Sequence, residues 1–556
     1  MHVHRRIAAA TAVALMAGGG FLAAGPSANA TPVPAGGGTA AAGSVPVAGT
    51  GTATAHSATV QASKVAVTTP APGPVLGKDG KPAGPAGTSG DAIATRSSRP
   101  APPSPASQPG GPNTGAGQSV ARAGLTAATS TAGKSPLADP SFAGASQSSS
   151  SCSTCTTPYV TAAVSATQIA ETVNLSLQVF SKSGSLVCAE SLSNLLGAIG
   201  GLTEPRIQYD NVASRYSMVI ASMPSTSSDV PVFYLATSQS SDACGAWWVY
   251  QIILSGNQYP LGGQLNYPYL GQDSTSLLAS TNNYTFGSSY LGTGAFAMPK
   301  AVAYTGNPFS ITTYSVDFST APPVVAGIPT ESTTTTYWLA AVPGTGFDVF
   351  SMPTSTAGAI SFVGTVSAAF NAPSRRIRQP GTSNTLNPLD GRIQSAVAQD
   401  GNIIWFANDI DDGGYPTVLY GAINGTNGNI ADALAYHGDN SDDFGPSIGV
   451  SPQGGNTDAV WLNWAYTASS VGVPVSATIN GIDPGNGVPN LIGSDLTLAT
   501  GKSATSINTF GAYSSVEIDP VASSSSCPAG LTALSAQEYF PSATQWGTFL
   551  ARTSFC

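Results

Sequence analysis

Acidic side chains gather in two short stretches of the sequence and are candidates for a metal site. The first reads DIDDGG at 409–414 and the second DNSDD at 439–443. Hard oxygen ligands of this kind suit calcium. Neither stretch has the complete D-x-D-x-D-G-x5-E pattern, so acids of exposed turns are the alternative interpretation. The only cofactor that the sequence suggests is therefore calcium, with candidate ligands Asp409, Asp411, Asp412, Asp439, Asp442 and Asp443.

Three arginines in the stretch SRRIRQP are candidates for binding an acidic ligand. In an extended chain, Arg376 and Arg378 project from one face of the strand. Convergent guanidinium groups can hold a carboxylate, and solvated charges beside a strand edge are the alternative. Arg375, Arg376 and Arg378 are therefore candidate ligand-binding residues.

One G-x-S-x-G motif, GPSIG at 445–449, raises the question of a serine hydrolase. A nucleophile elbow needs a strand-turn-helix context, and the acid and histidine follow the serine. His437 precedes Ser447, and the other three histidines are His2, His4 and His56. This distribution also excludes a histidine-clustered zinc site and an H-E-x-x-H motif. We interpret GPSIG as a turn entering a strand and assign no catalytic residue.

Composition excludes several classes of protein. The 556 residues include 19 basic and 28 acidic side chains, a net charge of −9, and only 8% of residues are charged. Binding to nucleic acid needs clustered Lys and Arg, which are absent here. The 63 Gly and 42 Pro argue against long helices, and no segment after the N-terminal region resembles a transmembrane span.

The chain divides into three parts by composition. Residues 1–30 have a basic start, an apolar centre and the small-residue site Ala28-Asn29-Ala30, which predicts a signal peptide and a secreted or envelope-associated protein. Residues 31–150 are rich in Ala, Gly, Ser, Thr and Pro, which predicts a disordered linker because little apolar surface can be buried. Residues 151–556 form the predicted folded domain.

Short strand-like segments separated by turn residues predict an all-β domain. Examples are the segments at 175–180, 217–220, 232–236 and 247–253, whereas 166–171 and 432–436 are helical candidates. Related phrases recur about 45 to 65 residues apart, a spacing that suits four-stranded blades. The phrases are EPRIQYDNVASRYSMVI at 204–220, YPYLGQD at 267–273, LDGRIQSAV at 389–397, FGPSIGV at 444–450 and FGAYSSVEIDP at 510–520. The sequence therefore predicts a β-propeller of about six or seven four-stranded blades.

These phrases resemble those of secreted bacterial β-propeller proteins of the sialidase-like and repeat-propeller group. The resemblance covers about residues 170–555 and departs at Glu204, Tyr216 and Ala512, where such repeats carry Asp, Trp and Asp. It implies a propeller, and many members of this group act as binding modules. The S-x-D-x-G-x-T-W box of sialidases is absent. In the hairpin at 204–220, Arg206 and Arg215 are expected to pair with Asp210.

An even set of six cysteines in a predicted exported protein indicates disulfide bonds. The residues are Cys152, Cys155, Cys188, Cys244, Cys527 and Cys556. Cys527 is expected to bond to Cys556, tying the chain end to the last blade. A redox role for the C-x-x-C at 152–155 lacks the βαβ context that it requires.

Two functions fit these features. The first is a non-catalytic binding or scaffold module for an extracellular glycan or an envelope protein. The alternative is a propeller glycan hydrolase or lyase that uses Asp409, Asp411 or Asp412 together with the arginines at 375–378. Clustering of these residues at the mouth of the central channel would favour the enzyme. An envelope structural protein without a small ligand is a third interpretation.

Overall fold

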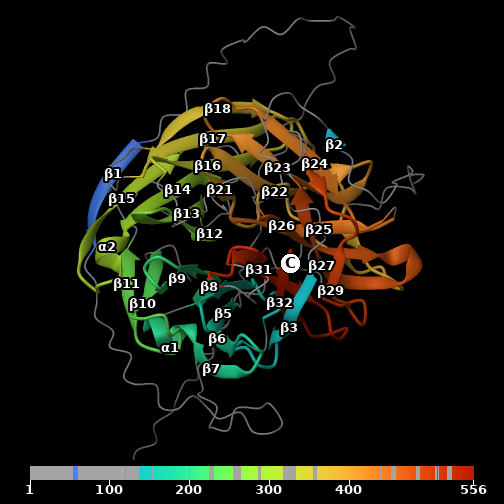
Figure 1. The fold of residues 1–556 in the computed structure, drawn as a ribbon, viewed down its shortest axis with the longest axis horizontal. Helices are drawn as coiled ribbons and strands as arrows, with labels where there is room; N and C mark the ends of the chain where they lie inside the picture. The colour runs from blue at the N-terminus through green and yellow to red at the C-terminus, as the bar shows by residue number, and fades with distance from the viewer. Residues whose placement is uncertain are drawn as a thin grey trace, which may run out of the picture.

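The chain folds into seven β-sheet blades arranged around a central axis (Figure 1). The computed structural model describes residues 54–60, 119–120 and 137–556, apart from 153–154, 199–200, 224–230, 254–263, 286–289, 317–332, 355–359, 439, 452–458, 484–488, 508–509, 511–512, 522–526 and 528. The predicted signal peptide lies outside the described residues. Within them, no helix has the length and hydropathy needed to cross a membrane.

Blades 1 to 3 follow one another along the chain as antiparallel four-stranded units. Blade 1 comprises β4 (Thr161–Val164), β5 (Gln168–Val173), β6 (Ser176–Ser181) and β7 (Leu186–Ser191). Blade 2 comprises β8 (Gly201–Asp210), β9 (Arg215–Met223), β10 (Val232–Ser238) and β11 (Trp247–Ile253). Blade 3 comprises β12 (Gln264–Gln272), β13 (Ser276–Tyr284), β14 (Tyr290–Pro299) and β15 (Phe309–Val316), with β1 (Thr54–Val60) paired to β15.

Blades 4 to 7 complete the ring. Three strands of blade 4 are described: β16 (Thr335–Val342), β17 (Gly346–Pro353) and β18 (Ser361–Ser367). Blade 5 comprises β21 (Ala398–Asp400), β22 (Ile403–Asp412), β23 (Tyr415–Asn424) and β24 (Ile430–Ala435), with β2 (Ser119–Val120) paired to β24. Blade 6 comprises β25 (Asp442–Ser451), β26 (Ala459–Ala468) and β27 (Val473–Asp483), with β28 (Asn490–Leu491) and β29 (Leu496–Ala499) paired to β27. Blade 7 comprises β30 (Ser515–Ile518), β31 (Thr532–Tyr539), β32 (Gly547–Ser554) and β3 (Leu137–Ser146).

The remaining elements are short. A two-stranded hairpin of β19 (Ile377–Arg378) and β20 (Thr385–Leu386) lies between blades 4 and 5 in the chain. The described helices are α1 (Leu192–Leu196), α2 (Lys300–Ala303) and the 3-10 turn η2 (Ser469–Val471).

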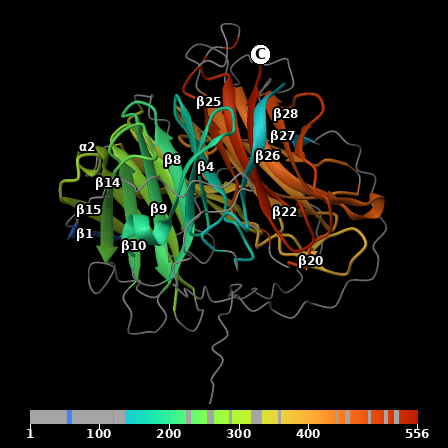
Figure 2. The same cartoon turned by 90° about the horizontal axis from the view of Figure 1, so that it is seen from below.

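The ring is closed by pairing of segments from opposite ends of the chain. β3 pairs antiparallel with β32, so that Leu137 faces Ser554 and Phe142 faces Leu550 (Figure 2 shows β3 beside the last blades). Blade 7 therefore takes its outer strand from residues that precede blade 1. The folded part accordingly begins no later than Leu137, ahead of the boundary at 151 that composition suggests.

Both faces of each blade are packed against neighbouring blades, and this explains the continuous apolar pattern of the strands. Every residue of β25 and β26 is buried. Between blades 2 and 3, the rings of Phe233 and Phe296 stack with centroids 5.1 Å apart. Between blades 4 and 5, the centroids of Phe347 and Phe406 are 4.3 Å apart. Such aromatic pairs add to the area-based stabilisation of the blade interfaces.

The strands predicted at 175–180, 217–220, 232–236 and 247–253 are confirmed, and both helical predictions are wrong. Residues 166–171 and 432–436 enter β5 and β24 instead. Each of these segments pairs along its length with a neighbouring strand of its blade. Backbone pairing and burial thus outweigh the local helical preference of their alanines.

Candidate functional site

Three inner strands share one local feature, a bulge at an X-Pro dipeptide, where they reach the centre of the propeller. Glu204, Tyr267 and Gly445 each precede a proline and have φ of 60°, 50° and 62°. The strand register shifts at these points. Positive φ is costly for a residue with a Cβ, so contacts must hold Glu204 and Tyr267 in place. Glu204 Oε2 supplies them by accepting hydrogen bonds from Tyr267 N and, at 3.0 Å, from the Tyr513 hydroxyl.

The side chain two positions after each of two bulges helps to form a buried cluster at the axis. The guanidinium of Arg206 lies 3.3 Å from the centre of the Tyr513 ring and 4.8 Å from that of Tyr269. Arg206 also donates to the carbonyls of Pro268 at 3.0 Å and Gln394 at 2.7 Å. All three members of this Arg206 cluster (Arg206, Tyr269 and Tyr513) are buried. The cluster therefore brings together blades 2, 3 and 7.

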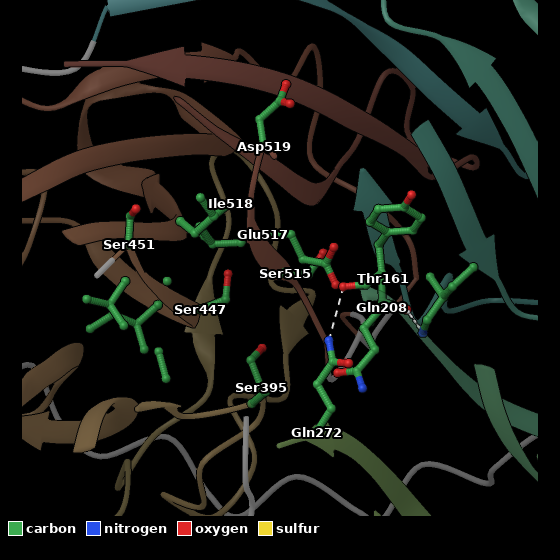
Figure 3. A pocket seen from close by; sticks show the side chains of 18 of the residues that line it. Thr161, Gln208, Gln272, Ser395, Ser447, Ser451, Ser515, Glu517, Ile518 and Asp519 are labelled. Carbon is green, nitrogen blue, oxygen red and sulfur yellow. Dashed lines mark hydrogen bonds between the residues drawn. The ribbon is translucent and has the colours of Figure 1, made fainter. Parts of the chain in front are cut away.

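A cavity of about 320 Å³ lies against the Arg206 cluster, among the inner strands (Figure 3). We call it the axial cavity. Arg206 lines it, so the Arg206 cluster forms part of its wall. Its other lining residues come from the inner strands of six blades and the segments next to them, and include Thr161, Gln208, Gln272, Ser395, Ser447, Ser451, Ser515, Glu517 and Asp519. Ligand sites in proteins commonly have this size and combine apolar walls with a few polar groups.

The polar lining is mostly uncharged amides and hydroxyls. Gln208 Nε2 donates to the Gly271 carbonyl at 3.0 Å, and Gln272 Nε2 donates to the Tyr209 carbonyl at 3.0 Å. Gln272 Oε1 is buried and has no hydrogen-bond partner among the described residues. An unsatisfied buried acceptor costs about 1–3 kcal/mol, so Gln272 Oε1 is an exception among the hydrogen-bonded polar groups of the cavity wall.

Glu517 places a carboxyl group in this mostly neutral environment. Its Oε2 accepts from Val164 N at 3.3 Å, and the backbone N–H of Tyr209 also bonds to it. The side chain lines the axial cavity and is partly exposed to it. Burial in the propeller nevertheless raises the pKa of Glu517 to about 8, more than the two backbone donors lower it. Glu517 is therefore largely protonated at neutral pH.

A second carboxylate of the lining, Asp519, is fully buried and neutralised by two cations. Lys182 Nζ lies 2.6 Å from Asp519 Oδ1, and Arg552 Nη2 lies 2.9 Å from Asp519 Oδ2. The three side chains tie the β6–β7 turn of blade 1 to blade 7. Asp519 thus acts as a brace between the first and last blades.

The predicted metal ligands Asp409 and Asp443 are both buried: Asp409 joins blade 5 to blade 6, and Asp443 is held within blade 6 and the turn that enters it. Asp409 accepts from Gln394 Nε2 at 2.6 Å and from Gly445 N at 3.1 Å, and burial raises its pKa to about 8. Asp443 accepts from Trp464 Nε1 at 2.9 Å and from His437 N at 2.9 Å, and burial raises its pKa to about 7.

Asp442 meets two of the predicted ligand-binding arginines. Its carboxylate lies 3.0 Å from Arg375 Nη2 and 2.7 Å from Arg378 Nη2. Both guanidinium groups also lie over the ring of Tyr415, at 4.1 Å and 4.8 Å from its centre. Arg376 donates from Nε to Thr385 Oγ1 at 3.0 Å. The acidic loop at 439–443 and the basic stretch at 375–378, which were predicted separately, are thus joined by ion pairs.

Two further predicted metal ligands, Asp411 and Asp412, lie in the β22–β23 hairpin. Asp411 accepts from Ser374 N at 2.9 Å and from Gly414 N at 2.7 Å, as a turn acid does. Burial, with a smaller contribution from Asp411, raises the pKa of Asp412. Asp439 lies outside the described residues. Among those described, no three His, Cys, Asp or Glu side chains form a group that could hold a metal ion, and calcium stays a prediction.

None of the described predicted ligands at 375, 376, 378, 409, 411, 412, 442 and 443 lines the axial cavity. The predicted pairing of Arg206 with Asp210 is wrong, because the bulge turns Arg206 toward the axis. Asp210 is instead bound by Lys300 at 2.7 Å and by the Tyr304 hydroxyl at 3.0 Å. Arg215 donates to the carbonyls of Ala213 and Ser214.

The serine of the G-x-S-x-G motif lies within β25, where it accepts from Asn463 Nδ2 at 3.3 Å. The motif was interpreted as a turn entering a strand; it instead lies wholly within the strand, which has a bulge where the turn was expected. His437 binds Asp495 and stacks on Tyr466, with ring centroids 3.6 Å apart. The histidine and its acid therefore form a pair of their own within blade 6 and its flanking turns.

All six cysteines form disulfides, and the predicted bond between Cys527 and Cys556 is confirmed. The other two bonds join Cys152 to Cys155 and Cys188 to Cys244. The second of these links blade 1 to the β10–β11 turn of blade 2. The disulfides thus secure the blade order near both ends of the folded chain.

Sequence reasoning missed Glu517, Gln272 and Gln208. Each lies in a phrase that had been recognised as a blade repeat, YPYLGQD, EPRIQYD or FGAYSSVEIDP. The usable signal was an acid within an otherwise uncharged inner strand, at Glu517. Its neighbours along the axis come from other blades, so their convergence is not visible in the sequence.

No protein-family model and no curated protein sequence matches the chain. Among solved structures, the chain is similar to a subtype N10 neuraminidase-like protein of A/little yellow-shouldered bat/Guatemala/060/2010. The two are 9% identical with a TM-score of 0.34, and the match covers 62% of this chain and 99% of that one. It is also similar to an exo-β-1,3-galactanase from Phanerochaete chrysosporium, with 12% identity, a TM-score of 0.28 and coverage of 74% and 99%. A third is a xylan β-1,4-xylosidase from Bacillus halodurans, with 10% identity, a TM-score of 0.26 and coverage of 71% and 94%.

Proposed function

We propose that this protein is a secreted binding module whose axial cavity takes a small, uncharged, hydroxyl-rich ligand, such as a sugar unit of an extracellular glycan. Three disulfides support an oxidising compartment. The observation that carries the ligand class is the unpartnered Gln272 Oε1 in the cavity wall. A ligand hydroxyl can donate to this oxygen and accept from other groups at the same time.

The charge distribution favours binding without turnover. Most glycosidases use two carboxyl groups about 5–10 Å apart, one of them ionised and accessible. In the described lining, Glu517 is one carboxyl and Asp519 is the other. Asp519 is saturated by Lys182 and Arg552, which leaves Glu517 without an available partner carboxylate.

A second candidate function, glycan hydrolysis, is favoured by one feature of the same cavity. A carboxyl group with a raised pKa is what a general acid requires at neutral pH, and Glu517 has this property. The residues proposed for this activity from sequence, Asp409, Asp411 and Asp412, do not line the cavity. An enzyme here would therefore depend on Glu517.

The test is a panel of soluble glycans and monosaccharides with the full-length chain, scored for binding by calorimetry and for product release by chromatography. Gln272→Leu should weaken binding at least tenfold. Gln399→Leu is the matched control, because Gln399 is also buried and hydrogen-bonded but lies outside the lining. Product release that disappears in Glu517→Gln would replace the binding function with hydrolysis. Absence of binding to every member of the panel would refute both.

A further inference from the structure

We infer that Glu517 binds the ligand of the axial cavity as a neutral acid, with its O–H donating to one ligand oxygen while Gln272 Oε1 accepts from a ligand hydroxyl. This inference rests on the proposed binding function. In the complex, Glu517 carries a proton. The ligand therefore binds when Glu517 is protonated and is released when Glu517 ionises.

Glu517 and Gln272 meet on the free edge of β8, although they come from blades 7 and 3. In a β-strand, the N–H and C=O of one residue point to the same side. The Tyr209 N–H bonds to Glu517, and the Tyr209 carbonyl accepts from Gln272 Nε2 at 3.0 Å. The two side chains therefore lie next to each other on the cavity side of a single residue. Adjacent hydroxyls of one ligand can reach both.

The hydrogen bonds of Glu517 leave its acid proton available. Both described hydrogen bonds to its carboxyl group come from backbone donors, Val164 N and Tyr209 N. Donors cannot accept the O–H of a protonated acid. A ligand oxygen in the cavity can do so, which gives the neutral form of Glu517 a favourable contact that the ionised form lacks.

The other titratable and charged groups around Glu517 are two phenols, an ion-paired aspartate and an arginine. From blade 2, burial raises the pKa values of Tyr209 and Tyr216, so both phenols stay neutral between pH 6 and 9. Directly after its own strand, Asp519 is held between Lys182 and Arg552. The segments that face it from β4 and β25, residues 161–164 and 447–451, carry no titratable side chain, and its partner on β31 is Leu534. Burial lowers the pKa of Arg206, in the cavity wall, but its guanidinium stays protonated, as arginines do in proteins.

Within this window, Glu517 is the cavity group whose charge changes, because burial raises its pKa to about 8. The pair of contacts also selects among ligands. A neutral polyol satisfies both Glu517 and Gln272. A carboxylate ligand can accept from Glu517 but cannot donate to Gln272 Oε1, and an amine cation would favour the ionised acid.

The experiment measures the affinity of the full-length chain for glucose, galactose, mannose and myo-inositol at pH 6 and pH 9, by ligand-observed NMR. These probes are neutral at both pH values. If only the protonated form binds and its pKa is about 8, the wild-type affinity falls about tenfold from pH 6 to pH 9. Glu517→Gln, which keeps a neutral donor but does not titrate, should bind with the same affinity at pH 6 and pH 9 and so lose the pH dependence.

Glu171→Gln is the matched control, because Glu171 is a buried carboxyl with a pKa of about 7 outside the axial cavity. It should retain the tenfold fall. Equal wild-type affinities at the two pH values would overturn the proton coupling and leave the binding function standing. No binding of any probe at either pH would instead overturn the binding function itself.

A measurement on the wild type keeps the inference testable should Glu517→Gln fail to fold. Calorimetry at pH 8 in two buffers of different ionisation enthalpy gives the number of protons taken up on binding. Because Glu517 is about half ionised at that pH, we expect uptake of about half a proton. Zero uptake would contradict the inference.

Discussion

Replacing the buried Asp409 by asparagine should change how the stability of the protein depends on pH. Asp409 is fully buried between blades 5 and 6, and burial raises its pKa from the ordinary 3.8 to about 8. Between these values the folded protein holds a proton that the unfolded chain has lost. The unfolded state then binds fewer protons, so the free energy of unfolding falls as the pH rises from about 4 to 8.

The size of the effect follows from the pKa difference. Each pH unit in this window costs the folded state about 1.4 kcal/mol, so Asp409 costs about 2 kcal/mol at pH 5 and about 5 kcal/mol at pH 8. The amide side chain of the Asp409→Asn variant does not titrate. Its carbonyl can still accept from Gly445 N, and Gln394 can turn its own amide to accept from the NH2 group of the variant. The stability of Asp409→Asn relative to wild type should therefore improve by about 3–4 kcal/mol between pH 5 and pH 8.

Urea unfolding of both proteins at the two pH values is the assay. Asn408→Ala is the control, because Asn408 is the buried neighbour of Asp409 on β22, donates to the Gly391 carbonyl at 3.0 Å and carries no titratable group. Its loss of stability should be the same at pH 5 and pH 8. A stability difference between Asp409→Asn and wild type that does not change with pH would refute the reasoning, since burial would then have no effect on this carboxyl.

Four further predictions concern the braces and the ring closure. Arg378→Ala removes one of the two cations that neutralise the buried Asp442 carboxylate. It should lower the free energy of unfolding, measured in urea, by about 1–3 kcal/mol and leave affinity in the glycan panel unchanged. Unchanged stability would contradict a bracing role. Replacing Cys527 and Cys556 by serine opens a loop of 29 residues and should cost about 3–4 kcal/mol in the same assay, whereas a cost near zero would mean that the bond is not formed. Deleting residues 1–146 removes β3 and should lower the melting temperature far more than deleting residues 1–136, because only the longer deletion opens the ring; equal losses would exclude this closure. Asp442 is paired with arginines, and Asp409 and Asp443 are hydrogen-bonded within the protein, so a chelator should leave the melting temperature unchanged. A fall in the melting temperature would instead support calcium at the acidic loops.

The propeller could be predicted from the sequence because its blades repeat the same strand entry. The X-Pro phrases at 204–210 and 267–273 mark the inner strands β8 and β12, and the phrase at 444–450 marks β25. The seven blades fall within the expected six or seven. The closing strand β3 was missed because its residues have the composition of the linker that precedes them, and only its pairing with β32 distinguishes it.

The site could not be predicted in the same way, because its residues are distributed over six blades. Carboxylates that stand out in the sequence, such as Asp409 and Asp443, proved to be buried, and backbone and side-chain donors hold them. Glu517 and Gln272 are about 245 residues apart in the chain and meet only because both bond to Tyr209. Spacing along a sequence carries no information about contacts that a ring of blades makes across its axis.

The low charge content of the chain explains why its cavity is lined by amides and hydroxyls. The ion pairs of the described residues hold blades or turns together: Lys182 and Arg552 with Asp519, Arg375 and Arg378 with Asp442, Lys300 with Asp210, and Arg392 with Asp390. Cations used in this way are not available to a ligand. The lining of the axial cavity is consequently left with neutral groups, with Glu517, and with Arg206, whose guanidinium already donates to the Pro268 and Gln394 carbonyls. A propeller with so few charges is therefore suited to the neutral ligand that we propose, and the inferred protonation of Glu517 would make binding of that ligand sensitive to pH.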